Sequence, residues 1–164
     1  MEEFIQVDHL EDLDAESKYL VHKAKEAAQH AYAPYSKFLV GAAALLDNGK
    51  VVTGTNQENA AYPSGMCAER VTLFVIASQF PEQKVVRLAV IAKRKQHKDL
   101  LPATSCGQCR QVMLEFEERQ SEPFKIVMLG ADNRWIVAPS AESLLPFSFS
   151  KSNLDHSHIT PHHE

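Results

Sequence analysis

Apolar and polar positions follow two different periods along the first third of the chain. From Ala15 to Ala33 the apolar residues recur every three or four positions, which predicts an amphipathic helix that Pro34 brings to an end. Phe38 to Leu46 is rich in small and β-branched residues and predicts a strand. Asp47-Asn48-Gly49 follows it, and an Asn-Gly pair between apolar runs is typical of a hairpin. Val51 to Thr55 is therefore expected to be the partner strand.

Continuous apolar runs alternate with helical patterns through the rest of the chain. Helices are predicted from Cys67 to about Gln79 and from Gly107 to Arg119, with a helical turn at Ala141 to Leu145. Three further strands are predicted at Val85 to Lys93, Phe124 to Leu129 and Trp135 to Ala138. Strands interleaved with helices indicate a layered α/β sheet.

Length and composition indicate one domain. A chain of 164 residues that is 45% hydrophobic can bury one sizeable core but hardly two. We therefore expect a single domain over residues 1–150, followed by a polar, loosely ordered tail over residues 151–164. The tail contains four histidines to which we assign no function beyond binding stray metal: His156, His158, His162 and His163.

Charge and hydropathy narrow the range of partners. The net charge of −4 lacks the basic excess that nonspecific binding of nucleic acid requires. No apolar run approaches the roughly 20 residues of a membrane span, and the acidic start Met1-Glu2-Glu3 is not typical of a signal peptide. We expect a cytoplasmic protein that binds neither nucleic acid nor membrane. The basic stretch Lys93 to Lys98 is interpreted as a solvated strand end, with phosphate binding as the alternative.

Three cysteines, Cys67, Cys106 and Cys109, carry the candidate chemistry. Their odd number argues against a disulfide framework, and the C-x-x-C pair leaves redox chemistry or metal ligation. Both cysteine segments lie where a loop leads into a predicted helix, and the unpaired N–H groups and dipole of a helix N-terminus lower the pKa of a thiol. Thiolates at two such ends are typical of a soft-metal site, and zinc is the metal that we expect.

The number of ligands favours a catalytic zinc ion over a structural one. Structural zinc is held by four protein ligands, whereas a catalytic site keeps one position for water. The chain offers three cysteines, and none of its eight histidines lies within either cysteine segment. Glu69, roughly 200° around an ideal helix from Cys67, is expected to face the metal-bound water and move its proton. Arg70 and Arg110 are expected to offset the negative charge of the thiolates.

The spacing of these residues resembles that of a known family. Cys67-Ala68-Glu69 followed by Cys106-x-x-Cys109 is similar to the paired motif of the zinc-dependent nucleoside and nucleobase deaminases, and in its three-cysteine form to cytidine deaminase. Two further segments, Tyr35 to Ala43 and Asn56 to Tyr62, match that family in the same order. The resemblance covers the chain from about Tyr32 to Phe149.

Two residues depart from the pattern of the family. Ser105 stands directly before the C-x-x-C pair and Leu39 directly after Phe38, at positions where the family usually has proline. Because proline limits the freedom of the unfolded chain, we expect effects on stability of about 1 kcal/mol and no loss of the metal.

The resemblance implies a three-layer α/β/α domain with a five-stranded mixed sheet, a homotetramer and one zinc ion per subunit. The residues that match Asn56 and Glu58 hold a ribose hydroxyl, and the one that matches Phe38 packs against the pyrimidine. The backbone of Ala68 matches a position that recognises the edge of the base, and the Thr104 carbonyl matches the acceptor for the leaving group. The remaining pocket residues, some of them reaching in from a neighbouring subunit, are Tyr35, Tyr62 and Phe149.

The reaction that the resemblance implies is the hydrolytic deamination of cytidine or deoxycytidine in pyrimidine salvage. Water activated by zinc attacks C4 of cytosine, and Glu69 delivers its proton to N3 and then to the departing amino group. The products are uridine, or deoxyuridine, and ammonia.

Other functions stay open on the sequence alone. A related deaminase could act on a modified cytosine nucleoside, as blasticidin-S deaminase does, although Asn56 and Glu58 favour an unmodified ribose. A polynucleotide-editing deaminase would need a basic channel with stacking aromatic residues, which the net charge of −4 opposes. The non-catalytic alternatives are a structural zinc knuckle, a redox C-x-x-C pair and a zinc-binding interaction module. In each of these, Glu69 would only stabilise the helix dipole.

Overall fold

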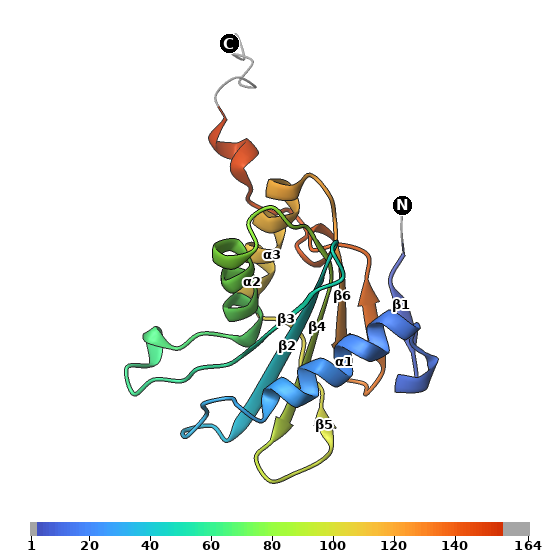
Figure 1. Cartoon of the computed structure of the whole chain (residues 1–164), viewed down its shortest axis with the longest axis vertical. Helices are drawn as coiled ribbons and strands as arrows, with labels where there is room; N and C mark the ends of the chain where they lie inside the picture. Colours follow the sequence, from blue (N-terminus) through green and yellow to red (C-terminus); the bar gives the residue numbers. More distant parts are fainter. Residues whose placement is uncertain (1–2, 156–164) are drawn as a thin grey trace.

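One mixed β-sheet with helices on both of its faces forms the protein (Figure 1). The computed structural model describes residues 3–155. The α-helices of this part of the chain are α1 (Ala15–Ala28), α2 (Ala68–Gln79) and α3 (Gly107–Gln120). Its 3-10 turns are η1 (Leu10–Asp12), η2 (Tyr62–Ser64), η3 (Glu142–Leu144) and η4 (Lys151–Leu154).

The sheet of residues 3–155 has seven strands in the order β1-β7-β6-β4-β2-β3, with β5 paired to β4. The strands are β1 (Ile5–Val7), β2 (Phe38–Leu46), β3 (Val51–Thr55), β4 (Val85–Arg94), β5 (Leu100–Leu101), β6 (Lys125–Leu129) and β7 (Trp135–Ala138). β4 and β6 run parallel, and the other pairs are antiparallel. A parallel pair needs a long crossover, and α3 lies in the one that joins β4 to β6.

The central strands contribute alternate side chains to two apolar layers. In β4, Leu88 and Val90 pack in the layer shared with α2 and α3, whereas Ala89 and Ile91 pack in the layer shared with α1. Successive side chains of a strand point to opposite faces of the sheet, so a strand that is buried on both faces has a continuous apolar run. This explains the run that predicted β4.

Two glycines let the helices lie directly on the sheet. A Cβ at Gly41 in β2 would overlap the carbonyl oxygen of Ala24 in α1. A Cβ at Gly54 in β3 would overlap the hydroxyl of Thr72 in α2. Only a residue without a side chain permits this approach, which fixes the position of α2 and with it the cysteine at its N-terminus.

The predicted three-layer α/β/α fold is confirmed, but the sheet has seven strands rather than five. The five predicted strands lie within one residue of the observed ones. The additional strands are β1, an exposed or half-buried edge strand, and β5, which is two residues long. Neither strand has a buried face of the length that produces an apolar period, so the sequence pattern does not reveal them.

The first helix ends at Ala28, five residues before the predicted end at Ala33. The backbone of Tyr32 instead pairs with the segment after β3. Its N–H donates to the Asn56 carbonyl over 3.1 Å, and its carbonyl accepts from the Glu58 N–H over 2.8 Å. Because this pairing requires extended backbone, tertiary contacts and not Pro34 set the end of the helix.

The predicted tail begins with regular structure. Lys151–Leu154 forms η4, in which the Ser150 side chain accepts from the backbone N–H of Asn153 and the Ser150 N–H donates to Asn153 Oδ1 over 2.9 Å. The rest of the tail, with its four histidines, lies outside the described residues.

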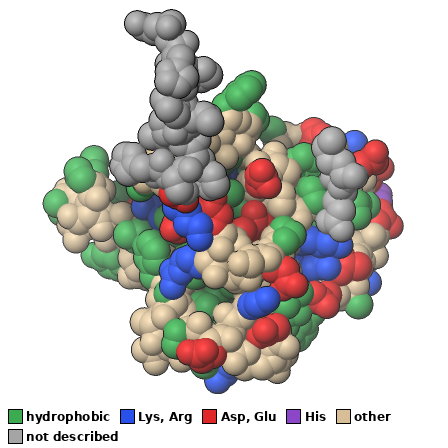
Figure 2. Space-filling model, turned by 90° about the horizontal axis from the view of Figure 1, so that it is seen from above, with side chains coloured by type: hydrophobic (Ala, Val, Ile, Leu, Met, Phe, Trp, Pro, Cys, Tyr) green, Lys and Arg blue, Asp and Glu red, His purple; other side chains and the backbone are tan. Residues whose placement is uncertain are grey.

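The helices of the described residues are short, and one face of the molecule carries charges of both signs (Figure 2). No helix within residues 3–155 is long and apolar enough to cross a membrane. Acidic and basic side chains are interspersed on the face that Figure 2 shows. Most of the basic stretch Lys93 to Lys98 is exposed, in agreement with a solvated strand end.

Candidate active site

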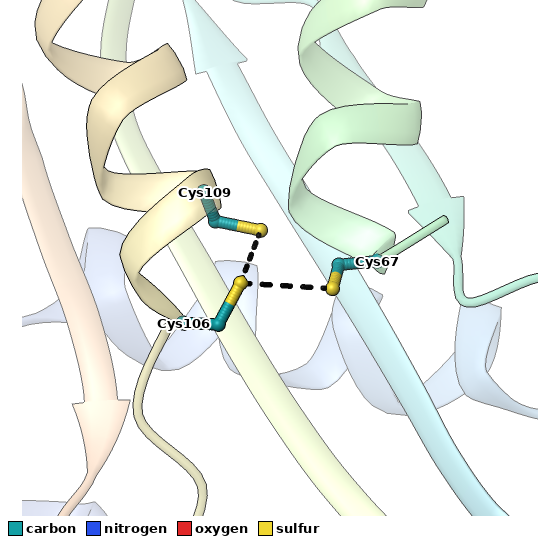
Figure 3. A group of neighbouring side chains, drawn as sticks. All are labelled: Cys67, Cys106 and Cys109. Atoms are coloured by element: carbon teal, nitrogen blue, oxygen red, sulfur yellow. Dashed lines mark hydrogen bonds between the residues drawn. The ribbon is translucent and has the colours of Figure 1, made fainter. Parts of the chain in front are cut away.

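The three thiols meet at the N-termini of α2 and α3 (Figure 3). Cys67 and Cys106 are the N-cap residues of the two helices, and Cys109 lies in the first turn of α3. The Sγ atoms of Cys67 and Cys106 are 3.8 Å apart, and those of Cys106 and Cys109 are 3.5 Å apart. All three Sγ atoms lie within 4.8 Å of one another.

This spacing fits a tetrahedral zinc ion. Zn–S bonds of about 2.3 Å at tetrahedral angles place neighbouring sulfurs about 3.8 Å apart. The three cysteines are free of disulfides, and within residues 3–155 they form the one group of three or more potential ligands with this spacing. Glu69 is not part of that group.

The surroundings of the thiols shift the pKa values of Cys67 and Cys109 in opposite directions. A hydrogen bond with Cys109 lowers the pKa of Cys67 to about 5, and Arg70 lowers it as well by donating from Nη2 to the Cys67 sulfur over 3.4 Å. The same hydrogen bond between thiols, together with burial, raises the pKa of Cys109. Cys67 is therefore ready to ligate a metal at neutral pH, whereas Cys109 exchanges its proton for the cation.

Glu69 is a buried carboxyl beside this cluster. It lies in the first turn of α2 and is only 4% exposed. Burial raises the pKa of Glu69, because the low-dielectric surroundings disfavour its ionised form. A carboxyl that titrates nearer to neutrality can both accept and release a proton during a reaction.

A cavity of 340 Å³ opens beside the thiols and Glu69. Most of the residues predicted from the sequence line this cavity: Phe38, Asn56, Glu58, Cys67, Ala68, Glu69, Thr104 and Cys106. Cys109 is fully buried and is absent from the lining. Two larger surface hollows, of 490 and 480 Å³, contain no cysteine, so the cavity with the metal-capable cluster is the candidate site.

Asn56 holds the beginning of β2 as well as lining the cavity. Its Oδ1 accepts from the Val40 N–H over 2.9 Å, and its Nδ2 donates to the Phe38 carbonyl over 2.9 Å. These two bonds fix the backbone on both sides of Leu39 and thus the position of the Phe38 ring. One hydrogen of Nδ2 is left for a ligand.

Glu58 organises the loop that precedes β2. Its carboxylate accepts from the Ser36 hydroxyl over 2.6 Å and from the backbone N–H groups of Tyr35 and Ser36 over 3.0 and 3.2 Å. The Ser36 hydroxyl is the main cause that lowers the pKa of Glu58. Glu58 is therefore an ionised acceptor at neutral pH, with lone pairs left for a hydroxyl.

The three remaining predicted pocket residues lie outside the cavity of their own chain. Tyr35 and Tyr62 line a neighbouring hollow of 270 Å³ with Glu58, and their rings form an edge-to-face pair with centroids 5.9 Å apart. Phe149 is 59% exposed, and its carbonyl accepts from Gln111 over 2.7 Å.

Residues 14–121 match the family model of the cytidine and deoxycytidylate deaminase zinc-binding region, which is more than half of the chain. The cytidine deaminase of Halalkalibacterium halodurans is 38% identical over 136 residues, which cover 83% of this chain and 96% of that protein. The chain belongs to the cytidine/deoxycytidylate deaminase family.

Other members of the cytidine deaminase family agree with this assignment. The enzyme of Sporosarcina psychrophila is 39% identical over 137 residues, which cover 84% of this chain and 93% of that protein. A crystal structure of cytidine deaminase from Burkholderia pseudomallei matches with a TM-score of 0.66 at 35% identity, covering 84% of this chain and all of that one. The predicted class, a zinc-dependent deaminase, and the predicted zinc cofactor are confirmed.

The two arginines that follow the cytidine deaminase cysteines have different positions. Arg70 Nη2 donates to the Cys67 sulfur over 3.4 Å, so its guanidinium lies beside the thiol cluster. Arg110 instead donates to the carbonyl oxygens of Ser105 and Leu144, over 2.8 and 3.2 Å. Arg110 thus braces the loop before α3.

Several lining residues had no signal in the sequence. They are Val40, Gln57, Gly65, Met66, Val90 and Ala103. Gln57 and Met66 exchange both backbone hydrogen bonds over 2.9 Å and so close the loop between β3 and α2 onto the cavity. Such backbone pairing depends on the folded path of the loop and not on the types of its side chains.

Proposed function

We propose that the protein converts cytidine and deoxycytidine to uridine and deoxyuridine by hydrolytic deamination, as a cytoplasmic enzyme of pyrimidine salvage. The observation that carries this proposal is one cavity whose lining joins the buried Glu69 carboxyl to the sulfurs of Cys67 and Cys106. Its 340 Å³ lies in the range of small-molecule pockets. The names of the related enzymes support cytidine as the substrate.

The three cysteines would hold the zinc ion. When bound, zinc lowers the pKa of a coordinated water and makes it a nucleophile at neutral pH. Three thiolates leave the site with a net negative charge, and the Arg70 guanidinium at 3.4 Å from the Cys67 sulfur reduces it. Arg70 thus preserves the ability of the site to polarise water.

Glu69 moves the proton in this proposal. It accepts the first proton of the attacking water and delivers it to N3 of cytosine. It then accepts the second proton, from the hydroxyl added at C4, and delivers it to the amino group, so that the C4–N bond breaks, ammonia leaves and the C4 carbonyl of uridine forms with N3 still protonated. The raised pKa that burial gives this carboxyl favours proton uptake from water, because a higher pKa makes the carboxylate a stronger base. The Thr104 carbonyl, also in the lining, accepts a hydrogen bond from the departing ammonia.

The nucleoside is held at its base and at its sugar. The Phe38 ring offers a flat apolar face to the pyrimidine, and the backbone of Ala68 recognises the edge of the base. Asn56 donates its remaining Nδ2 hydrogen to a ribose hydroxyl, which donates in turn to Glu58. Both polar residues are already fixed by other bonds, so they bind the sugar without further loss of side-chain entropy.

We further propose a homotetramer in which neighbouring subunits share residues of their active sites. Tyr62 and Phe149 are exposed in the single chain and do not line its cavity. Large exposed aromatic side chains are typical of surfaces that a partner covers.

The first experiment compares substrates. The zinc-loaded protein is mixed with cytidine, deoxycytidine and free cytosine, and the loss of ultraviolet absorbance is followed. Turnover of the nucleosides without turnover of the base is expected, because Asn56 and Glu58 act on the sugar. An inactive protein with zinc bound would contradict the proposal and direct the search to modified cytosine nucleosides and oligonucleotides.

The second experiment removes the proton carrier. Glu69→Gln is expected to lower kcat by at least about 100-fold, since an amide keeps the shape of the side chain but cannot shuttle a proton. Zinc content should stay at one ion per chain, and Glu82→Gln, at an exposed site, should keep full activity. A Glu69→Gln enzyme of undiminished activity would refute the assigned role.

A further inference from the structure

The Ser36 hydroxyl joins two residues that line the cavity, although Ser36 itself is not part of the lining. It donates to Glu58 Oε2 over 2.6 Å and accepts from the Phe38 N–H over 3.0 Å. A serine hydroxyl has one hydrogen, and with the Phe38 N–H on one of its lone pairs that hydrogen is directed to the carboxylate. Ser36 therefore links the acid that is proposed to bind the sugar to the residue that is proposed to pack on the base.

The other hydrogen bonds of Glu58 show which of its oxygens is left for a substrate. Oε1 accepts from the backbone N–H groups of Tyr35 and Ser36 over 3.0 and 3.2 Å, so both of its lone pairs are used. Oε2 accepts from the Ser36 hydroxyl and keeps capacity for a further donor. The acceptor for a ribose hydroxyl is therefore Oε2, the oxygen whose direction the Ser36 hydroxyl sets.

The backbone next to Ser36 is held in a conformation that permits this bond. Lys37 has a positive φ of 59°, which is uncommon for a residue with a side chain. Its N–H donates to the Ala33 carbonyl over 3.1 Å, and its carbonyl accepts from the Lys95 N–H over 2.9 Å. These two bonds stabilise the turn that brings the Ser36 hydroxyl to Glu58.

We infer that Ser36 is a positioning residue for recognition of the sugar: its hydroxyl directs the remaining acceptor site of Glu58 Oε2 at a ribose hydroxyl. The inference rests on the proposed deamination. A short hydrogen bond to a carboxylate is strong and directional, and a carboxylate that is oriented before binding loses less entropy when the substrate binds. The hydrogen bonds of Ser36 reach neither a cysteine nor Glu69, so its effect is on affinity and not on proton transfer.

The test removes the hydroxyl and restores it. In the zinc-loaded full chain, Ser36→Ala is expected to raise KM for cytidine about fivefold, the usual contribution of one exposed hydrogen bond. kcat should change by less than about twofold, because the groups that move the proton are unaffected. Ser36→Thr keeps the hydroxyl at an exposed position and should bring KM to within about twofold of the wild type.

Substrates that lack one hydroxyl separate this role from general damage to the loop. 2′-Deoxycytidine and 3′-deoxycytidine are compared with cytidine, and the wild type should show the lower kcat/KM for the analogue without the hydroxyl that Glu58 binds. Ser36→Ala should reduce this penalty at least about threefold, because the carboxylate no longer binds the hydroxyl in a fixed direction. A loop that is merely damaged would raise KM for all three nucleosides by the same factor.

A double variant tests whether Ser36 acts through Glu58. Glu58→Gln keeps the shape of the side chain without its charge, and Ser36→Ala added to it should change KM by less than about twofold, since the two residues form one interaction. Ser143→Ala is the matched control, because its hydroxyl also donates over 2.6 Å, but to the Ser140 carbonyl. It should leave KM, kcat and the penalty for the missing hydroxyl unchanged.

A failure of this role is distinct from a failure of the proposed function. Wild-type protein that does not deaminate cytidine would overturn both. Active wild type with an unchanged KM in Ser36→Ala, or an equal rise of KM for all three nucleosides, would overturn the role of Ser36 alone. Additive effects of Ser36→Ala and Glu58→Gln would also overturn it, because the hydroxyl would then act on something other than the carboxylate.

Discussion

At the scale of single residues, the charges around the zinc site decide how well it holds its metal. Cys67 and Cys109 have different pKa values although both are expected to bind the zinc ion. Arg70 contacts Cys67, the thiol with the lower pKa. Arg70 and Arg110 can be compared directly, since Arg70 donates to the Cys67 sulfur and Arg110 donates to backbone carbonyl groups.

Arg70→Gln is expected to weaken zinc binding by roughly 10- to 100-fold, the usual cost of losing a group that supports a ligand. The thiolate of Cys67 would lose its cation, its pKa would rise, and protons would compete better with zinc. Competition with a coloured chelator at pH 7 measures the change. Arg110→Gln is the control and should lower thermal stability with little effect on zinc; equal losses of zinc in both variants would contradict this assignment.

The residue types of the site could be predicted from the sequence, but their secondary roles could not. Cys67 with Glu69 and Cys106 with Cys109 are close in the chain, and helix geometry carries their spacing into space. The bonds of Asn56 to β2, by contrast, join residues 16 and 18 positions apart. Nothing local in the sequence encodes such a contact.

At the scale of elements, buried polar side chains set how the helices and strands are joined. Glu117 in α3 is nearly buried, and burial raises the pKa of its carboxyl. Its Oε2 accepts from the N–H groups of Phe124 and Ala141 over 2.8 and 2.9 Å, and its Oε1 accepts from the Glu142 N–H over 3.1 Å. One side chain thus joins α3 to the start of β6 and to the connection after β7.

Glu117→Ala is expected to lower the free energy of unfolding by roughly 3 kcal/mol or more, because two buried N–H groups and a third, partly buried one lose their acceptor. Glu117→Gln should cost less, since its amide oxygen can serve two of these groups while its NH₂ faces the third. Urea titration of the zinc-loaded protein gives both values. Glu115→Ala, on the exposed side of α3, should change stability by less than about 0.5 kcal/mol, and a loss as large as that of Glu117→Ala would argue against the junction.

The elements themselves were largely predictable because burial on one or two faces leaves a periodic pattern. That is why β2, β3, β4, β6 and β7 were found within a residue, whereas the exposed β1 and the two-residue β5 were not. The end of α1 was predicted too late in the chain, at Ala33 instead of Ala28, for a different reason. A helical period continued to Ala33, but Tyr32 gained more from pairing with Asn56 and Glu58 across the fold.

At the scale of the whole molecule, the single chain leaves large aromatic side chains uncovered. Tyr62 belongs to the connection between β3 and α2, which extends to one side in Figure 1. Phe147, with a positive φ of 57°, and Phe149 lie in the segment that leads to η4, which projects beyond α3 in the same view. These exposed positions suit contacts between copies of the chain, as the proposed tetramer requires.

Shared active sites predict that two impaired chains restore each other. One chain carries Glu69→Gln and the other carries Tyr62→Ala with Phe149→Ala. If the aromatic residues act in the site of a neighbour, some mixed sites are intact. In these, Glu69 comes from the chain with the aromatic substitutions, and Tyr62 and Phe149 come from the chain with Glu69→Gln. Equal mixing should make about a quarter of the sites intact, because each half of a site is drawn independently. The activity of co-expressed, doubly tagged assemblies should then exceed the mean of the two parent variants.

The decisive control pairs two defects that lie in the same half of the site. Glu69 and Cys67 act in one cavity of one chain, so co-assembly of Glu69→Gln with Cys67→Ala should restore no activity. Sedimentation confirms that both mixtures form assemblies of the same size. Complementation of the aromatic pair without complementation of the Cys67 pair can arise only if a neighbour supplies side chains to the cavity. Activity equal to the parental mean in both mixtures would instead mean that each chain builds its site alone.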